Sequence, residues 1–169
     1  MENYICINGK KTKLTEEQMR ALGIELLRTN PFERVEPFEW YYFINSLGEV
    51  DNTYDDGTCA RGGCGEEQFN VANYCTDKAI MEQRALHETL NRLLWRYSME
   101  HDGDKIDWNS FDQQKWFIFV DVDDGRMHVD NIRICVRPGN IYFHTQETAK
   151  NAIKEIIEPF MKAHPEFKW

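Results

Sequence analysis

Of the five cysteines and five histidines, three cysteines and one histidine are the candidates for binding a metal ion. Thiolates and imidazoles are the ligands that zinc prefers, and the glycines around Cys59 and Cys64 would let the chain wrap closely around an ion. The spacing is not that of a zinc finger, because four residues separate these two cysteines and no Cys-x2-Cys pair occurs. We therefore expect no metal and no other cofactor, with a zinc-stabilised domain as the alternative built from Cys59, Cys64, Cys75 and His87.

Other motifs that could do chemistry are incomplete. "HETLN", which begins at His87, resembles the zinc-protease pattern H-E-x-x-H, but Asn91 stands where the second histidine is needed. "DVDDG", which begins at Asp121, resembles a calcium loop, but its glycine comes one place early and no glutamate closes the loop. Cys75 and His87 could act as nucleophile and base only if a third group oriented them. We therefore predict that the chain is not an enzyme.

Acidic residues are concentrated between Glu100 and Asp124, where eight carboxylates stand against Lys105 and Lys115. A solvated loop followed by a turn would explain this composition. The alternative is an acidic face that binds a basic partner, such as a protein that handles nucleic acid. The predicted partner-binding residues of this face are Asp102, Asp104, Asp107, Trp108, Asp121, Asp123 and Asp124.

Composition narrows the class of protein further. The net charge of −9 disfavours direct binding to nucleic acid or to anionic membranes, since that affinity comes mainly from lysine and arginine. No apolar run approaches the ~20 residues of a membrane-spanning helix, and the N-terminus lacks the pattern of a signal peptide. Five cysteines without a secretion signal indicate reduced thiols. We therefore expect a cytoplasmic protein.

The residue pattern predicts an α+β fold that opens with a hairpin and a helix in residues 1–30. Asn8-Gly9 lies between two short apolar runs and favours a two-residue hairpin turn, because both turn positions need positive φ. Thr15 and Gln18 have the spacing of a capping box, which indicates the start of a helix.

Two strand-strand-helix units are predicted to follow, in residues 38–101 and 114–169. In each unit a tryptophan begins an aromatic strand, a glycine turns the chain back, and a threonine caps an amphipathic helix. The segment "FNVANYC", which precedes the first helix, is predicted to be extended. We expect the N-terminal hairpin-helix and both units to pack as one compact domain. The corresponding residues of the two units are Trp40 and Trp116, Gly48 and Gly125, and Thr76 and Thr145.

Several stretches of the chain are similar to a known group of proteins. "YCTDK", "LNRLLWRYSMEHDGDKIDW" and "IYFHTQETAKNAIKEIIEPFMKAHPEFKW", together with the earlier "INGK", "LTEEQ" and "NPFERV", extend over nearly the whole chain. With these stretches the chain resembles small acidic proteins encoded by phages, prophages and other mobile elements of Gram-positive bacteria. Many members of that group carry a glycine at the position of Ala72.

The resemblance implies an accessory protein of a mobile element, located in the cytoplasm of a bacterial host. Such proteins often act by binding a host protein, and anti-CRISPR inhibitors of bacterial defence are similar in size and charge. We therefore expect a non-enzymatic protein that binds a host or defence protein with a basic surface. A small nucleic-acid-binding or regulatory module is the alternative function, and exposed C-terminal aromatics leave a homodimer open.

Overall fold

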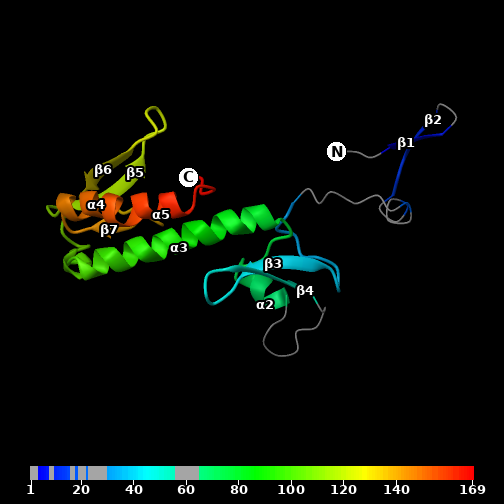
Figure 1. Cartoon of the computed structure of the whole chain (residues 1–169), viewed down its shortest axis with the longest axis horizontal. Coiled ribbons are helices and arrows are strands. Elements are labelled where there is room, and N and C mark those ends of the chain that lie inside the picture. Colours follow the sequence, from blue (N-terminus) through cyan, green and yellow to red (C-terminus); the bar gives the residue numbers. More distant parts are fainter. Residues whose placement is uncertain (1–3, 8–9, 16–17, 19–21, 23–29, 56–64) are drawn as a thin grey trace. The chain divides into compact units, whose positions relative to one another are not determined.

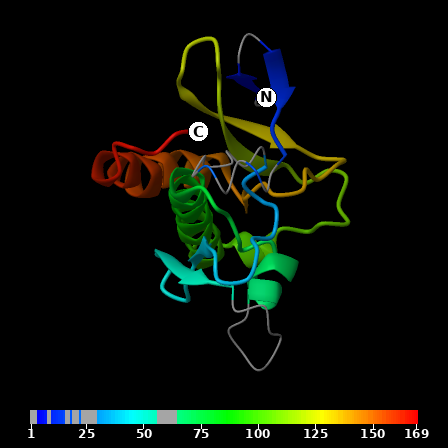
Figure 2. The ribbon, with the colours of Figure 1, turned by 90° about the vertical axis from the view of Figure 1, so that its right-hand side faces the viewer.

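The computed structural model describes residues 4–7, 10–15, 18, 22, 30–55 and 65–169. The chain forms two compact units, Met1–Glu33 and Arg34–Trp169, and Figure 1 and Figure 2 show their helices and strands. The mixture of helices with small antiparallel sheets confirms the predicted α+β class. The packing of all predicted parts as one compact domain stays a prediction.

The N-terminal unit contains the predicted hairpin. Strand β1 (Tyr4–Ile7) pairs antiparallel with strand β2 (Lys10–Lys13), and Ile7 is opposite Lys10. The turn residues between them lie outside the described residues. The capping box is confirmed, because the Gln18 N–H donates to Thr15 Oγ1 at 3.2 Å and the Thr15 N–H donates to Gln18 Oε1 at 2.9 Å. The predicted helix body lies outside the described residues.

The second unit begins with a hairpin of strands β3 (Trp40–Ile44) and β4 (Val50–Tyr54). Gly48 has φ +86 and turns the chain between them, as predicted. "FNVANYC" is extended only at its end, where Cys75 forms an antiparallel bridge with Tyr42 of β3. The prediction was wrong for its first two residues, because they complete the short helix α2 (Gly65–Asn70).

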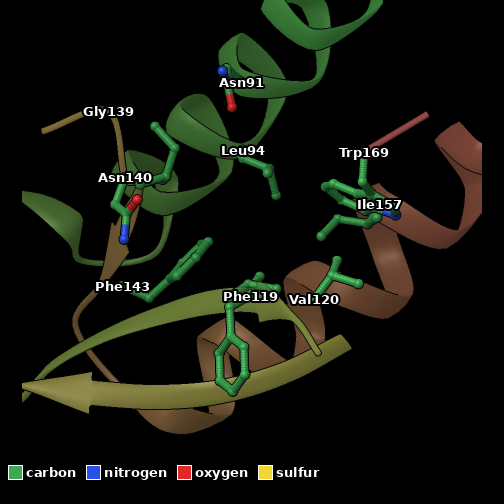
Figure 3. A pocket seen from close by; sticks show the side chains of 11 residues that line it. Asn91, Leu94, Phe119, Val120, Gly139, Asn140, Phe143, Ile157 and Trp169 are labelled. Atoms are coloured by element: carbon green, nitrogen blue, oxygen red, sulfur yellow. The ribbon is translucent and has the colours of Figure 1, made fainter. Parts of the chain in front are cut away.

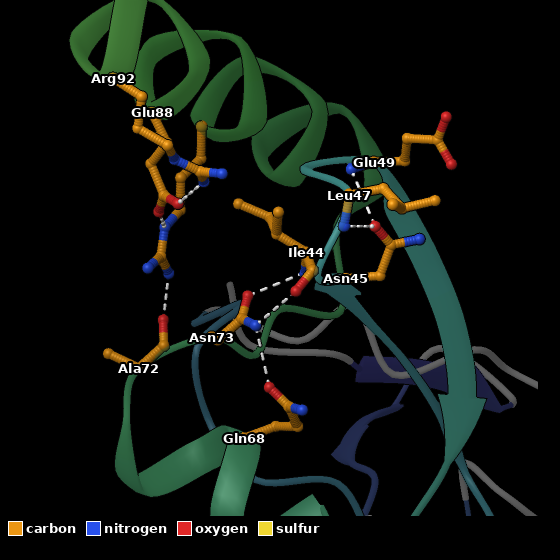
Figure 4. A network of polar contacts seen from close by, with 10 residues as sticks. Ile44, Asn45, Leu47, Glu49, Gln68, Ala72, Asn73, Glu88 and Arg92 are labelled. Atoms are coloured by element: carbon orange, nitrogen blue, oxygen red, sulfur yellow. Dashed lines mark hydrogen bonds and ion pairs between the residues drawn. The ribbon is translucent and has the colours of Figure 1, made fainter. Parts of the chain in front are cut away.

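The outer edge of β3 is closed by an amide side chain. Asn73 Oδ1 accepts the Ile44 N–H at 2.8 Å, while Asn73 Nδ2 donates to the Ile44 carbonyl at 2.8 Å and to Gln68 Oε1 at 2.9 Å (Figure 4). The side chain thus takes the place that a neighbouring strand would occupy. Backbone polar groups at a sheet edge therefore find partners within the chain.

Ala72, which precedes this amide, has a strained backbone. Its φ is +55, a left-handed conformation that a Cβ atom makes costly. Its carbonyl accepts a hydrogen bond from Arg84 Nη1. Glu88 holds Arg84 at 2.8 Å and Arg92 at 3.0 Å, so one carboxylate positions two guanidinium groups (Figure 4).

We predict that Ala72→Gly raises the free energy of unfolding by about 1 kcal/mol, because glycine adopts positive φ without a steric cost. Urea denaturation followed by circular dichroism measures the change. The matched control is Ala79→Gly in the first turn of the following helix, where the same substitution should lower stability. An equal decrease in both variants would contradict the prediction.

Helix α3 (Lys78–Glu100) is the longest element. Its N-cap is Asp77, whose Oδ1 accepts the N–H groups of Ala79 at 2.9 Å and Ile80 at 3.2 Å. The predicted cap, Thr76, was wrong by one residue. A carboxylate that accepts two N–H groups at a helix start is also favoured by the helix dipole.

Helix α3 packs with different partners along its length (Figure 1). Near its N-terminus, Met81 and Ala85 pack with Ile44 and Cys75. The C-terminal half contributes to the largest hydrophobic cluster, which buries Leu90, Leu94, Tyr97, Phe143, Ala149, Ala152, Ile157, Phe160 and Phe167. Both hairpins of this unit therefore depend on the same helix for their cores.

The second hairpin belongs to a three-stranded sheet in the order β6-β5-β7. Strand β5 (Lys115–Val120) pairs antiparallel with β6 (Met127–Ile132) on one side and with β7 (Tyr142–Phe143) on the other. Gly125 has φ +68 and forms the predicted turn between β5 and β6. A short 3-10 helix, η1 (Gly103–Lys105), lies between α3 and β5.

The C-terminal helix is interrupted in the middle. Thr145 caps α4 (Gln146–Ala152), as predicted, by accepting the Thr148 N–H at 3.1 Å. The chain then forms a π-helix, η2 (Ile153–Ile157), before α5 (Glu158–Ala163). Pro159 lies at the start of α5 and has no N–H to donate, which accounts for an interruption at this point.

Strands β4 and β6 share the tripeptide Val-Asp-Asn, and each has one strand neighbour among the described residues. In an antiparallel pair, alternate N–H groups point away from the neighbouring strand. The Asn52 N–H donates to the Asp51 carboxylate at 2.8 Å, and the Asn131 N–H donates to the Asp130 carboxylate at 2.7 Å. A carboxylate therefore covers one outward N–H on each open edge.

Candidate functional site

The first group of predicted partner-binding residues surrounds η1. Asp102, Asp104, Asp107 and Trp108 are all exposed. Asp102 has φ +66 and binds Lys105 Nζ at 2.6 Å. The hydrogen bond from Lys105 lowers the pKa of the Asp102 carboxyl, so this carboxylate keeps its charge over a wider pH range.

The loop that follows η1 is fixed by a buried lysine. Lys115 is only 1% exposed, and its Nζ donates to the carbonyls of Ser110 at 3.0 Å, Gln113 at 3.3 Å and Arg133 at 3.3 Å. The Gln113 side chain also accepts the Asp107 N–H at 2.6 Å. The lysine thus ties this acidic loop to the end of β6.

Two aromatic residues of the acidic loop are exposed. The Trp108 ring contacts Tyr142 edge-on at 5.5 Å and remains half-exposed, and Phe111 is more exposed still. Aromatic residues in a charged surface are typical of protein interfaces, where they contribute much of the affinity. This loop therefore combines carboxylates with apolar contact area.

The second group of predicted residues forms the turn between β5 and β6. Asp121 accepts the Asp123 N–H at 2.9 Å, and Asp124 accepts the Arg126 N–H at 2.8 Å. The His128 ring nitrogen lies 3.1 Å from Asp124. Carboxylate and imidazole atoms of Asp121, Asp124 and His128 lie within 4.8 Å of one another, close enough to hold a metal ion. Hairpin hydrogen bonds already account for both carboxylates, so this cluster needs no ion to explain it.

The two acidic groups lie at opposite ends of β5. The first precedes Lys115 and the second follows Val120, so the whole strand separates them. A strand of this length spans on the order of 20 Å. The structure thus brings together the acids within each group but does not join the groups into one continuous patch.

A pH titration should detect the hydrogen bonds of Asp124. The Arg126 N–H, and after it His128, lowers the pKa of this carboxyl below its ordinary 3.8. The stabilisation of the turn by the ionised Asp124 carboxylate is therefore fully present above the pKa of the unfolded chain. It is lost as the pH falls through the lower pKa of the folded chain. We expect the Arg126 amide NMR signal to titrate with a midpoint below 3.8, and to lose this transition in Asp124→Asn. A midpoint at or above 3.8 would contradict the prediction.

The candidate zinc ligands are not gathered in the described part of the chain. Cys75 is fully buried among Ile44, Met81 and Ala85, whereas the His87 ring packs on Phe167 at 4.8 Å. Burial raises the pKa of the Cys75 thiol, which disfavours the thiolate needed for metal binding or nucleophilic attack. The other two candidates, Cys59 and Cys64, lie outside the described residues.

A cavity of about 240 Å³ lies between α3, β5 and the C-terminus (Figure 3). If the β5–β7 register continued, Gly139 would stand opposite Val120, but the pairing stops at Tyr142 and a gap opens. The cavity is lined mainly by apolar groups, including Leu94 and Ile157. Ligand pockets typically measure ~300–1,000 Å³, so this cavity is better explained by imperfect packing than by substrate binding.

Sequence reasoning missed a second exposed aromatic surface, formed by Phe38, Trp40 and Tyr54. We call these three residues the aromatic platform. The aromatic run from Trp40 was assigned to a strand, but no side of that strand was predicted to be exposed. The available signal was Pro37-Phe38, because the position after a turn proline can require positive φ, which favours glycine and not a large residue.

Comparison with protein-family models, with curated proteins and with solved structures gives no match for this chain. Among the described residues, no helix combines the length and apolar character needed to cross a bilayer.

Proposed function

We propose that the chain is a non-enzymatic accessory protein of a phage or mobile element. It acts in the cytoplasm of a bacterial host, where it binds a host or defence protein that has a basic surface. An anti-CRISPR-type inhibitor, which would occupy the nucleic-acid channel of a defence complex, fits this description. The two strand-strand-helix units are proposed to act together as one domain.

The observation that carries this proposal is the charge balance around η1. Within this loop, Lys105 is bound to Asp102 and the Nζ of Lys115 is turned inward onto backbone carbonyls. The other carboxylates therefore face solvent beside Trp108 and Phe111. Such a surface attracts a basic partner over a distance and then offers aromatic contact area once the partner has docked.

Charge reversal tests the proposal most cleanly at Asp104 and Asp123. Their carboxylates form no hydrogen bond or ion pair with the described residues, whereas Asp107, Asp121 and Asp124 each hold a turn. Reversing the first two to lysine should therefore change the surface without damaging its support. The matched control reverses Glu67 and Glu158, two exposed glutamates on other elements.

The functional readout is phage plating on bacteria that carry a defined CRISPR–Cas system. Expression of the wild-type chain should raise the plating efficiency, and the double control variant should do the same. The double variant Asp104→Lys with Asp123→Lys should raise the plating efficiency at least about tenfold less than the wild type does, since close charge pairs at interfaces are worth more than 1.4 kcal/mol. If this variant raised the plating efficiency as much as the wild type does, these acidic residues would have no role in the proposed function.

Affinity capture identifies the partner in the same strains. The wild-type chain and both double variants are captured in parallel, and the bound proteins are quantified by mass spectrometry. A basic protein that is retained by the control but lost by the reversed variant is the expected result. Recovery of nucleic acid without protein would instead favour the alternative of a nucleic-acid-binding module.

A further inference from the structure

The aromatic platform is a set of exposed rings that contact one another. Phe38 is 73% exposed, Trp40 61% and Tyr54 49%. The Tyr54 ring stacks with Phe38 at 6.4 Å and meets Trp40 edge-on at 5.8 Å. Trp40 and Tyr54 are also direct partners in the β3–β4 register, so the hairpin holds both rings side by side.

The fold does not explain why a phenylalanine stands at the end of this platform. The Glu39 N–H donates to the Glu36 carbonyl at 3.1 Å, which closes a turn with Pro37 second and Phe38 third. Phe38 has φ +71, and a turn with proline second and positive φ third is of the type that favours glycine there. A bulky residue in this conformation is strained, and its ring is mostly in solvent. Strain without burial indicates a role other than stability.

The surroundings of the platform are acidic. Residues 36–54 contain four acids and no lysine or arginine, and Arg34, which lies just before them, is paired with the buried Asp55. Glu36 and Glu39 lie in the turn itself, and the Glu39 carboxylate also accepts the Glu36 N–H at 3.1 Å. Aromatic faces attract cations, and nearby carboxylates strengthen the preference for a positive charge.

We propose that the aromatic platform binds an arginine side chain from a basic segment of a partner protein. The guanidinium group would lie on the rings of Trp40 and Tyr54 while Glu36 or Glu39 pairs with its charge. The inference rests on the proposed function for the class of partner, a protein with a basic surface. It does not use the acidic residues at β5, so either surface can fail without the other.

The test is an NMR titration of the full ¹⁵N-labelled chain with a short glycine–arginine peptide. We expect a saturable shift of the Trp40 indole N–H signal, which is identified by its absence in Trp40→Leu. A matched peptide with citrulline in place of arginine keeps the shape but lacks the charge, and should give no saturable shift. An equal shift with citrulline, or no shift with arginine, would overturn the proposal.

Variants of the protein separate binding from folding. Trp40→Leu should lower the affinity for the arginine peptide about tenfold, a loss of the size expected for a cation–π contact. Trp95→Leu removes a similarly exposed tryptophan from α3 and should leave binding unchanged. Phe38→Gly should raise the melting temperature, because it relieves the positive φ, yet weaken binding. Retained binding in both Trp40→Leu and Phe38→Gly would also overturn the proposal.

The same titration distinguishes this inference from the acidic residues at β5. Asp104→Lys with Asp123→Lys should bind the arginine peptide as the wild type does, even if phage plating is affected. Loss of peptide binding in that variant would place the binding site near β5 and contradict the proposal that the aromatic platform binds arginine. A single-stranded oligonucleotide that shifts the Trp40 signal more strongly than the peptide would contradict the assignment to a basic protein.

Discussion

Replacing Lys115 with methionine should lower the free energy of unfolding by about 3 kcal/mol. Methionine fills a similar volume but cannot donate, so the carbonyls of Ser110, Gln113 and Arg133 would lose a shared charged donor. Hydrogen bonds to charged groups are worth ~1.5–3 kcal/mol each, and the apolar gain from methionine offsets part of the loss. Denaturant unfolding at neutral pH measures the change.

A matched control for this prediction is Lys105→Met, which makes the same chemical change at an exposed lysine. It should leave stability within experimental error, because surface ion pairs contribute little. Hydrogen exchange adds a local readout, since amides between Ser110 and Gln113 should lose protection in Lys115→Met before those of α3. A free energy of unfolding equal to that of the wild type would contradict the stabilising role of the Lys115 hydrogen bonds.

Replacing Asp55 with alanine should also cost about 3 kcal/mol. Asp55 is 1% exposed, and its carboxylate accepts from Arg34 Nε at 2.8 Å and from Arg34 Nη2 at 3.3 Å. Breaking a buried pair typically costs ~3–5 kcal/mol, and the partial exposure of Arg34 places this pair at the lower end. A Cβ built on Gly65 would lie 2.5 Å from Asp55 Oδ2, so the start of α2 is packed against the same carboxylate.

The control for Asp55 is Asp112→Ala, which removes an exposed carboxylate from the loop after η1. Surface substitutions of this kind change stability by less than ~0.5 kcal/mol. Arg34→Met in combination with Asp55→Ala then measures the coupling of the pair by a double-mutant cycle. If Asp55→Ala alone lowered the free energy of unfolding as little as Asp112→Ala does, the Arg34–Asp55 pair would not stabilise the fold.

Turns and caps could be predicted from the sequence because their signals are local. Gly48 and Gly125 occupy positions with positive φ, and Thr15 and Thr145 accept the N–H groups that their spacing indicated. The exception is Thr76, where two adjacent residues could both serve as a cap. The choice of the neighbouring aspartate depends on the local backbone conformation, which the sequence does not display.

The roles of single charged and aromatic residues were harder to predict. In the sequence Lys115 is one cation among many acids, and its burial depends on distant carbonyls, including that of Arg133 just after β6. Trp40 and Tyr41 are neighbours in one aromatic run, yet the second is fully buried and the first is exposed. Strand alternation predicts opposite faces for neighbouring residues, but only the packing decides which face is covered.

The density of acids in the sequence was also a poor guide to their grouping in space. Asp107 and Asp121 fall in one acidic window, yet β5 runs between them. Because a strand rises more than 3 Å per residue, a short strand is enough to divide a linear cluster into two. The candidate site is therefore two smaller surfaces, each with its own supporting hydrogen bonds.

The carboxylates on the open strands have a consequence for concentrated solutions of this protein. Strands β4 and β6 are two of the edge strands, among the described residues, where copies could join edge to edge, and fibrils grow by the same pairing. Asp51 and Asp130 oppose this pairing, because an incoming strand would have to displace a carboxylate from its N–H group and then lie beside the negative charge. The shelf life of the protein would then depend in part on two side chains that contribute little to its folded core.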